Sequence, residues 1–223
     1  MRMTFYKFII VLCAILYCQI SICQDTINLK NPSFEDTPRV GIQGMPTCKG
    51  WEDCGRDLFP GEAPPDILPT SENGWGVTKA PSDGKTYLAM VVRATDTWES
   101  LTQHVVGFLK AGMCYSFSAK LAISNVYESR TKASYQSGQK ESFVHPVIFE
   151  IWGGLSACDR MELLAESPPV ENFDWQLFEF VLSPKRNYTY FTIKVYYTND
   201  RPDKYNGHML IDDLSPIVEI QCK

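Results

Sequence analysis

The stretch MCYSFSAKLAI, residues 113–123, decides the class of fold that this chain is expected to adopt. Apolar and small polar side chains alternate along it with a period of two. This period predicts a half-buried β-strand, because successive side chains of a strand point to opposite faces of the sheet. The core face is expected to carry Tyr115, Phe117, Ala119, Leu121 and Ile123, and the other face Ser116, Ser118, Lys120 and Ser124.

Further segments share the preference for β-branched and aromatic residues that marks strands. Helical periodicity is nearly absent; only 159–165 suits a turn or two of helix, and a strand competes there. The loops 47–85 and 125–145 are expected to carry little regular structure. The expected strands are 86–93, 101–108, 113–123, 147–152, 175–182, 188–197 and 209–211. About eight to ten strands predict two packed antiparallel sheets, a jelly-roll β-sandwich, with a closed eight-stranded barrel as the alternative.

The first 23 residues are expected to form a signal peptide that is removed. Arg2 and Lys7 supply the positive start, residues 8–20 are mostly apolar, and residues 21–23 provide small side chains at a cleavage site. The apolar run is shorter than the roughly 18–20 residues that span a bilayer. The mature chain, 24–223, is therefore expected to be one exported β-sandwich domain without a membrane span, located outside the cell, in the periplasm or at the cell surface.

Charge and composition narrow the class of partner. The full chain of 223 residues has a formal net charge of −5, which becomes −7 in the mature chain because Arg2 and Lys7 are removed and no acid is. A mildly acidic chain without basic clusters is not expected to bind nucleic acid. The aromatic content of 13% is ample for a sizeable core.

Five cysteines remain in the mature chain, and in an exported protein they are candidates for disulfides. Cys48 and Cys54 are close enough in sequence to staple one loop. Cys114, Cys158 and Cys222 would then supply a second bridge and one free thiol. A zinc site is the alternative, but the chain has no C-x₂-C pair and its three histidines are isolated.

Two short motifs carry a family resemblance. NPSFED (31–36), followed by Gly50-Trp51, and LIDDLS (210–215) resemble jelly-roll carbohydrate-binding modules with a galactose-binding-like fold. The stretches PPDILP (64–69) and TYLAMVVRATDTWESLTQ (86–103) are similar to secreted or surface-attached domains of Bacteroidetes-type bacteria, some of which precede an OmpA-like peptidoglycan-binding domain. The resemblance covers most of the mature chain. It implies a sandwich whose first and last strands lie close together.

The resemblance also implies a structural calcium ion where the two ends meet. Glu35 and Asp212 would provide carboxylates, with Asp213 as a further candidate. Ca²⁺ takes six to eight oxygen ligands, and carboxylates that converge from distant segments need a cation between them. The alternative is that these acids only decorate a turn and cap the last strand. The role of a calcium ion here would be to hold the fold together and not to carry out chemistry.

A glycan-binding surface needs an aromatic platform beside side chains that form hydrogen bonds with hydroxyl groups. The strand pattern places aromatic, basic and acidic residues on faces expected to be wet, where they would form a shallow groove. The alternative is that Trp152 belongs to the core, that Arg93 pairs with a surface acid and that Trp98 covers a loop. The candidate residues are Tyr87, Arg93, Trp98, Glu99, Lys120, Glu150 and Trp152.

Catalytic patterns are weak. The chain contains no G-x-S-x-G nucleophile elbow and no H-E-x-x-H motif. A glycosidase needs two carboxylates at a set separation, and nothing in the sequence selects Glu99 and Glu150 over other acids. The predicted function is an exported, non-catalytic module that binds a glycan or a cell-envelope polysaccharide. A structural or adhesive envelope protein that contacts other envelope proteins is the competing hypothesis, ahead of a glycoside-cleaving enzyme.

Overall fold

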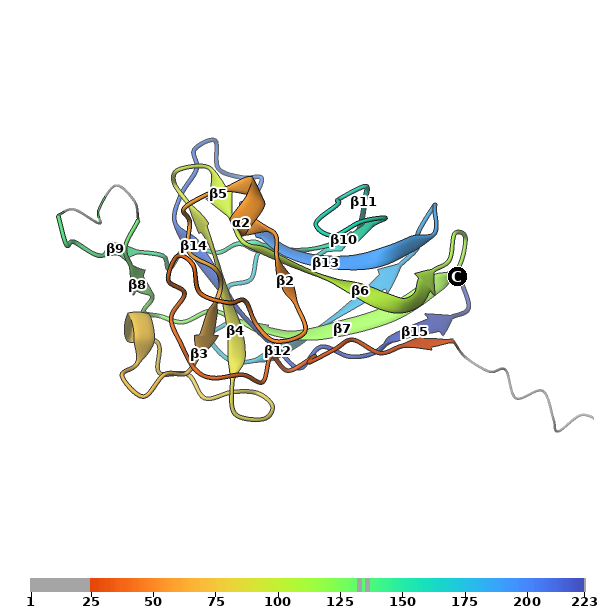
Figure 1. The fold of residues 1–223 in the computed structure, drawn as a ribbon, viewed down its shortest axis with the longest axis horizontal. Helices are drawn as coiled ribbons and strands as arrows, with labels where there is room; N and C mark the ends of the chain where they lie inside the picture. Colours follow the sequence, from red (N-terminus) through yellow and green to blue (C-terminus); the bar gives the residue numbers. More distant parts are fainter. Residues whose placement is uncertain (1–24, 132–133, 135–136, 223) are drawn as a thin grey trace, which may run out of the picture.

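The computed structural model describes residues 25–131, 134 and 137–222, and places them in two antiparallel β-sheets packed face to face (Figure 1). Every ladder between two named strands is antiparallel. The predicted all-β antiparallel sandwich is confirmed. The expected signal peptide, 1–23, lies outside the described residues.

The larger sheet has eight strands in the order β1-β15-β7-β14-β4-β3, with β12 paired to β7 and β5 paired to β4. These strands are β1 (Thr26–Ile27), β3 (Asp66–Leu68), β4 (Tyr87–Arg93), β5 (Thr97–Trp98), β7 (Cys114–Ala122), β12 (Gln176–Leu182), β14 (Gly207–Asp212) and β15 (Ile217–Ile220).

The smaller sheet has five strands in the order β11-β10-β13-β6-β2. They are β2 (Glu52–Asp53), β6 (Ser100–Leu109), β10 (Ile148–Gly154), β11 (Glu162–Glu166) and β13 (Tyr188–Tyr196). The strand β11 corrects the turn of helix weighed for 159–165. Both loops expected to be irregular contain short elements: α2 (Gly55–Leu58), η1 (Gly74–Gly76), β2 and β3 in the first, and the hairpin β8 (Glu128–Ser129) and β9 (Glu141–Ser142) in the second.

In the structure, the two faces of β7 are buried and partly exposed as the alternation of its side chains predicted. Tyr115, Phe117 and Leu121 are buried between the two sheets, while Lys120 on the opposite face is only partly covered. Phe117 packs edge-on against Phe191 of the smaller sheet, with ring centroids 5.2 Å apart. Truncating such a core aromatic to alanine costs about 3–5 kcal/mol. The inter-sheet core therefore rests on the residues that the period of two selects.

Strand β4 is buried on both faces, which corrects the expectation that Tyr87 faces solvent. Leu88 and Met90 enter the inter-sheet core, as their alternation predicted. Tyr87 points outward but is 0% exposed, because Tyr127, Phe143 and other residues form a second apolar layer over this part of the sheet. The Tyr87 hydroxyl donates to the carbonyl of Lys79 at 3.0 Å. A period of two distinguishes two faces but does not reveal that a distant segment covers one of them.

The two ends of the chain meet, as the end motifs predicted. Strand β1 pairs with β15, placing Thr26 opposite Val218 and Ile27 opposite Ile217. The motifs themselves are joined by the Leu214 N–H, which donates to the Pro32 carbonyl at 3.1 Å. Apposition of first and last strands therefore closes the sandwich.

The disulfides are Cys54–Cys158 and Cys114–Cys222, and Cys48 is a buried free thiol. The expected Cys48–Cys54 bridge is wrong. Closeness in sequence makes a loop easy to close, but Cys54 follows edge strand β2 and meets a residue 104 positions away. The second bridge does join two of the three cysteines expected to supply it.

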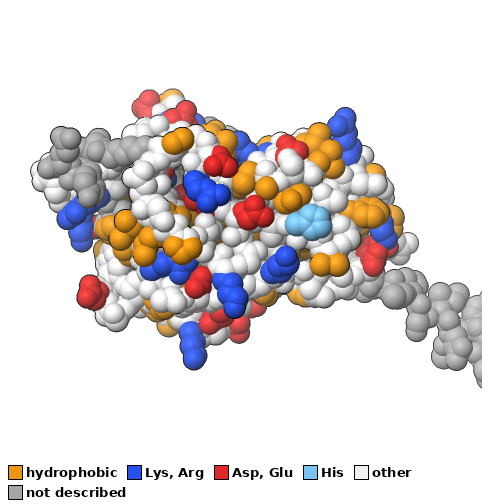
Figure 2. All heavy atoms as spheres, viewed as in Figure 1, with side chains coloured by type: hydrophobic (Ala, Val, Ile, Leu, Met, Phe, Trp, Pro, Cys, Tyr) orange, Lys and Arg blue, Asp and Glu red, His pale blue; other side chains and the backbone are white. Residues whose placement is uncertain are grey.

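The surface carries charges of both signs. On the face seen in Figure 2, acidic and basic side chains lie interspersed without an extended area of one sign. Among the described residues, no helix combines the length and apolar character required to cross a membrane.

Candidate functional site

One short segment, residues 97–100, connects the two sheets and serves two polar clusters. Trp98 ends β5, which pairs with β4 in the larger sheet, and Ser100 begins β6 in the smaller sheet. Glu99 lies between them and binds Arg93 of β4. Trp98 packs instead against Tyr196 of the smaller sheet, with ring centroids 5.2 Å apart. Neighbouring residues thus enter different sites.

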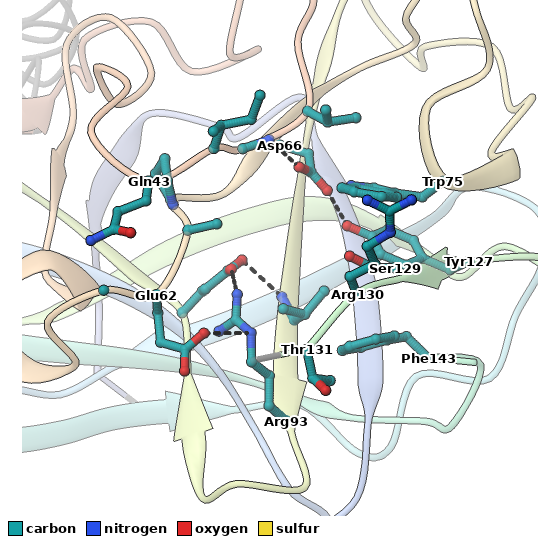
Figure 3. A pocket seen from close by; sticks show the side chains of 18 residues that line it. Gln43, Glu62, Asp66, Trp75, Arg93, Tyr127, Ser129, Arg130, Thr131 and Phe143 are labelled. Carbon is teal, nitrogen blue, oxygen red and sulfur yellow. Dashed lines mark hydrogen bonds and ion pairs between the residues drawn. The ribbon is translucent and has the colours of Figure 1, made fainter. Parts of the chain in front are cut away.

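The first site is a cavity of about 730 Å³ on the outer side of β3 and β4, which we call the Arg93 pocket (Figure 3). This volume falls in the range of small-molecule sites, roughly 300–1,000 Å³. The loops 40–43 and 61–64 form one side of the pocket, and the β8 hairpin forms the other. Its aromatic lining is Trp75, Tyr127 and Phe143, and its polar lining includes Gln43, Ser129 and Arg130.

Arg93 is the buried cation of this pocket, with 6% of its surface exposed. Its Nη2 donates to Glu99 Oε1 at 2.5 Å, and its Nε lies 3.4 Å from Glu62 Oε2. Its Nη1 is buried and has no hydrogen-bond partner among the described residues. A guanidinium has five N–H donors, so the two carboxylates leave part of this group unsatisfied.

Glu99 is fully enclosed beside this arginine. Its Oε2 accepts the Val91 N–H at 3.0 Å, so both carboxyl oxygens have donors. Burial raises the pKa of Glu99 to about 8, because loss of solvation outweighs the stabilising charge of Arg93.

Asp66 of β3 ties the walls of the pocket together. Its Oδ1 accepts the Gly41 N–H at 2.5 Å, and its Oδ2 accepts the hydroxyl of Tyr127. Burial raises its pKa above the usual value for an aspartate. Because Gly41 and Tyr127 come from opposite walls, this one carboxyl group sets their separation.

Trp75 lines the pocket from an unusual backbone conformation. Its φ is +57°, in the left-handed region that bulky residues rarely adopt, and its neighbours Asn73 and Gly76 also have positive φ. The turn is held by the Gly76 N–H, which donates to the Asn73 carbonyl at 2.8 Å. A residue in such a conformation costs roughly 1–3 kcal/mol and is concentrated at functional sites.

The second site, which we call the Lys194 cluster, lies on the outer side of the smaller sheet and consists of Trp98, Glu150, Trp152, Lys194 and Tyr196. Lys194 is 4% exposed, and its Nζ lies 2.8 Å from Glu150 Oε2. The Trp152 indole donates to the same oxygen at 2.7 Å. Lys194 Nζ also lies 3.3 Å from the ring centroid of Tyr196 and 4.9 Å from that of Trp98. Burial lowers the pKa of Lys194 to about 8.

A disulfide-tied loop covers this cluster. Cys54 follows β2 at one edge of the smaller sheet, and Cys158 lies between β10 and β11 at the other edge. Three strand spacings, about 14 Å, separate β2 from β10, so a disulfide between these edges requires a loop that crosses the sheet. Arg160 of this loop lies over the Trp98 ring, 5.4 Å from its centroid. The outward-facing Ser100, Thr102 and Thr192 are consequently 0% exposed.

The structure does not bring the seven predicted ligand-binding residues into one groove. Two lie in the Arg93 pocket, three in the Lys194 cluster, one in the apolar layer over β4, and one on β7 opposite Asp212. The prediction of a single shared face is wrong, because the chain passes between the sheets at Glu99. Which of these residues contacts a ligand stays a prediction. Arg93 and Glu99 lie in the Arg93 pocket, and Trp98, Glu150 and Trp152 lie in the Lys194 cluster. Tyr87 lies in the apolar layer over β4, and Lys120 lies on β7 opposite Asp212.

Several pocket residues were missed from the sequence because they come from the two loops expected to be irregular. Glu62 and Trp75 belong to the first loop, and Tyr127 and Arg130 to the second. One local signal was present: Trp75 lies within Asn-Gly-Trp-Gly, and an aromatic residue inside so strong a turn sequence is placed near the surface.

The predicted calcium residues meet at one turn, residues 82–86. Glu35 Oε1 accepts the N–H groups of Lys85 and Thr86 at 2.7 and 3.0 Å. Asp212 Oδ2 accepts those of Ser82 and Asp83 at 2.8 and 2.9 Å. Burial raises the pKa of Asp212 to about 6. The end motifs are thus bound to a common segment by backbone donors.

This arrangement does not fit a calcium shell as it stands. Asp212 Oδ1 also accepts an N–H, from Asp213, so both of its oxygens face donors where a cation requires acceptors. Asp213 is exposed. No group of three or more acidic, histidine or cysteine side chains suited to a metal occurs among the residues that the structure describes. Calcium stays a prediction, and the melting temperature with and without EDTA tests it.

No family model matches this chain, and no curated protein matches it. Among solved structures, the CBM22-1 xylan-binding domain of Paenibacillus barcinonensis Xyn10C is 12% identical, with a TM-score of 0.47 over 90% of this chain and 97% of that one. The K2 cleaved adhesin domain of Lys-gingipain is 10% identical, with a TM-score of 0.47 over 91% of this chain and 100% of that one.

A CBM22-1–GH10 structure of Clostridium thermocellum xylanase 10B, complexed with xylohexaose, is 14% identical, with a TM-score of 0.45 over 89% of this chain. The match spans 29% of that chain's length. At these scores, what this chain binds has to be argued from its own residues.

Proposed function

We propose that this protein is an exported, non-catalytic module that binds a glycan in the Arg93 pocket. The end motifs of the sequence, which resemble those of carbohydrate-binding modules, support this class. Two disulfides suit an oxidising compartment outside the cytosol. The pocket combines aromatic rings, on which the C–H face of a sugar stacks, with amide, hydroxyl and guanidinium groups that bind its hydroxyls.

Trp75 is the observation that carries this proposal. Its ring lines the cavity and is partly exposed, and its backbone is held in a conformation that a tryptophan adopts only at a cost. The turn fixes the direction of the Trp75 ring at the wall of the cavity.

The positions of the carboxyl groups favour binding over hydrolysis. Glu99 and Glu150, the pair considered from the sequence, belong to different clusters, and each is engaged by a cation. Asp66 has donors on both oxygens. A glycosidase instead keeps an acid and a base or nucleophile facing the same sugar linkage.

A glycan array probed with wild-type protein, Trp75→Gly and Lys120→Ala tests the proposal. We expect wild type and Lys120→Ala to retain the same glycans. We expect Trp75→Gly to lose about tenfold in affinity, or about 1.4 kcal/mol, because the ring on which the sugar stacks is removed. Lys120 is the matched control, since it lies on β7 and does not line the pocket. Retention unaffected by Trp75→Gly, or no retention of any glycan, would overturn the proposal. Release of reducing ends would establish an enzyme instead.

A further inference from the structure

The strongest unexplained feature of the Arg93 pocket is the unpartnered nitrogen of its buried arginine. Arg93 Nη1 lacks an acceptor, although Nε and Nη2 are engaged by Glu62 and Glu99. Leaving a buried donor unsatisfied costs about 1–3 kcal/mol, and more when the group is charged. In Figure 3 the Arg93 guanidinium points toward Glu62, and Thr131 lies on the other side of the Arg93 side chain. An acceptor supplied from the pocket would remove this cost.

The carboxyl groups around Arg93 are compatible with one further negative charge, supplied by a ligand in the pocket. Glu62, Asp66 and Glu99 are the carboxyl groups of the pocket. Burial raises the pKa of Glu99 to about 8 and raises that of Asp66, so the protein environment disfavours the ionised form of both. Glu62 faces Arg93, with its Oε2 3.4 Å from the arginine Nε.

A second guanidinium stands at the same cavity. Arg130 lines the pocket, is exposed, and forms no ion pair among the described residues. Guanidinium groups bind carboxylates through two parallel N–H···O bonds, which gives both energy and orientation. Gln43 and Ser129, which also line the pocket, can bind neighbouring hydroxyl groups.

We propose that the glycan bound in this pocket carries a carboxylate, as a uronic acid does, and that Arg93 Nη1 and Arg130 bind that group. This inference rests on the proposed function and specifies its ligand. The net charge of −5 opposes association with densely charged polyanions. A sugar unit with a single carboxylate carries only one negative charge, so the net negative charge of the protein repels it little. Within the cavity, its carboxylate is complementary to the two arginines.

The test compares matched sugars that differ only in the acid: methyl glucuronide against methyl glucoside, and methyl galacturonide against methyl galactoside, by titration calorimetry at pH 7. We expect the acidic member of at least one pair to bind about tenfold or more tightly, with affinity falling as salt is added. Arg130→Gln should remove most of that preference, lowering the affinity for the acidic member by a larger factor than the affinity for the neutral member.

Arg93→Lys should remove the preference as well, but its fold must be checked by thermal melting because Arg93 holds two buried acids. Arg130→Gln carries no such risk, since Arg130 is exposed. Equal affinity within each pair, or an acid preference that survives Arg130→Gln, would overturn this inference while leaving glycan binding intact. Retention of sulfated sugars in place of carboxylated ones would also overturn it. If no glycan of either kind binds, the proposed function itself fails.

Discussion

The Arg93 pocket and the Lys194 cluster are built from the same chemistry and differ in what lies above them. Each sets a buried base against a buried glutamate, Arg93 with Glu99 and Lys194 with Glu150. Each has aromatic walls. In the Lys194 cluster, Lys194 and Glu150 are buried and Arg160 of the Cys158 loop lies over Trp98, whereas the Arg93 pocket retains a cavity of about 730 Å³.

Each site also contains a buried donor without an acceptor among the described residues, Arg93 Nη1 in the pocket and Trp98 Nε1 in the cluster. Glu150 Oε2 accepts from both Lys194 and Trp152, and the lysine also lies against two aromatic rings. The arginine of the pocket has a nitrogen without any acceptor. Because both sites contain an unsatisfied donor, the cavity beside Arg93 is what distinguishes the pocket as a candidate binding site. The composition of the two clusters would not separate a structural site from a binding site.

The largest effect is expected in the closed cluster. Lys194→Met leaves Glu150 buried without its cation, and we expect the free energy of unfolding to fall by about 3–5 kcal/mol while glycan binding is unchanged. Chemical denaturation measures this change. The double variant Lys194→Met/Glu150→Leu should recover most of the loss, because no unpaired charge remains. A loss below about 1 kcal/mol in the single variant would show that the Lys194–Glu150 ion pair behaves like one exposed to solvent.

Removing the cover should have the next largest effect. Cys54→Ser/Cys158→Ser is expected to lower the free energy of unfolding by about 2–4 kcal/mol and to make tryptophan fluorescence more accessible to a soluble quencher. Cys114→Ser/Cys222→Ser is the matched control, since its sequence separation is 108 against 104. The control should lose similar stability without the increase in quenching. Equal quenching in both variants would contradict the assignment of a cover.

A smaller effect is expected from Glu99 in the open pocket. Its pKa is about 8 in the folded protein against 4.5 as the ordinary value, so the native state retains a proton that the unfolded state has lost between these pH values. Stability from this group is therefore fully present below pH 4.5 and is lost as the pH rises toward 8.

Comparing wild type with Glu99→Gln at pH 6 and pH 8 isolates this group, because the shifted pKa values of Asp212, about 6, His208, about 4, and Lys194, about 8, are common to both proteins. We expect Glu99→Gln to reduce the fall in the free energy of unfolding across the window by about 2 kcal/mol. The same pH dependence in wild type and Glu99→Gln would contradict the shifted pKa.

The smallest stability effect is expected at Trp75. Trp75→Gly removes aromatic packing but relieves the positive φ, so we expect the free energy of unfolding to change by no more than about 1 kcal/mol. Trp75→Ala is the matched variant and should be less stable than Trp75→Gly by about 1 kcal/mol, because alanine keeps the strain. Thermal melts of both variants measure this order. An alanine variant as stable as the glycine variant would argue against strain at this position.

The fold could be predicted because its signals are local. The alternation over 113–123 depends only on the geometry of an extended chain, and β7 follows it residue by residue. Strand β4 was likewise placed by its pattern. The end motifs predicted the apposition of first and last strands, which the pairing of β1 with β15 confirms.

The candidate site could be predicted only in part. Arg93, Glu99, Trp98 and Glu150 were chosen as polar or aromatic residues of middle strands, yet the structure divides them between two clusters. Trp75 was not among the candidate residues, because it lies in a loop where the sequence indicates a turn but no strand. The pairing of Cys54 with Cys158 had no sequence signal at all.

The sequence by itself determined the all-β sandwich and the inward-facing residues of its main strands, since these depend on a period that each strand displays alone. Tertiary structure decided which outward faces meet solvent. Tyr87 is covered by residues that include Tyr127 and Phe143, Lys194 and Glu150 are buried on the outer side of the smaller sheet, and the Arg93 pocket stays open. The physical reason is that burial of an outward face depends on segments tens of residues away, whose approach no local pattern records.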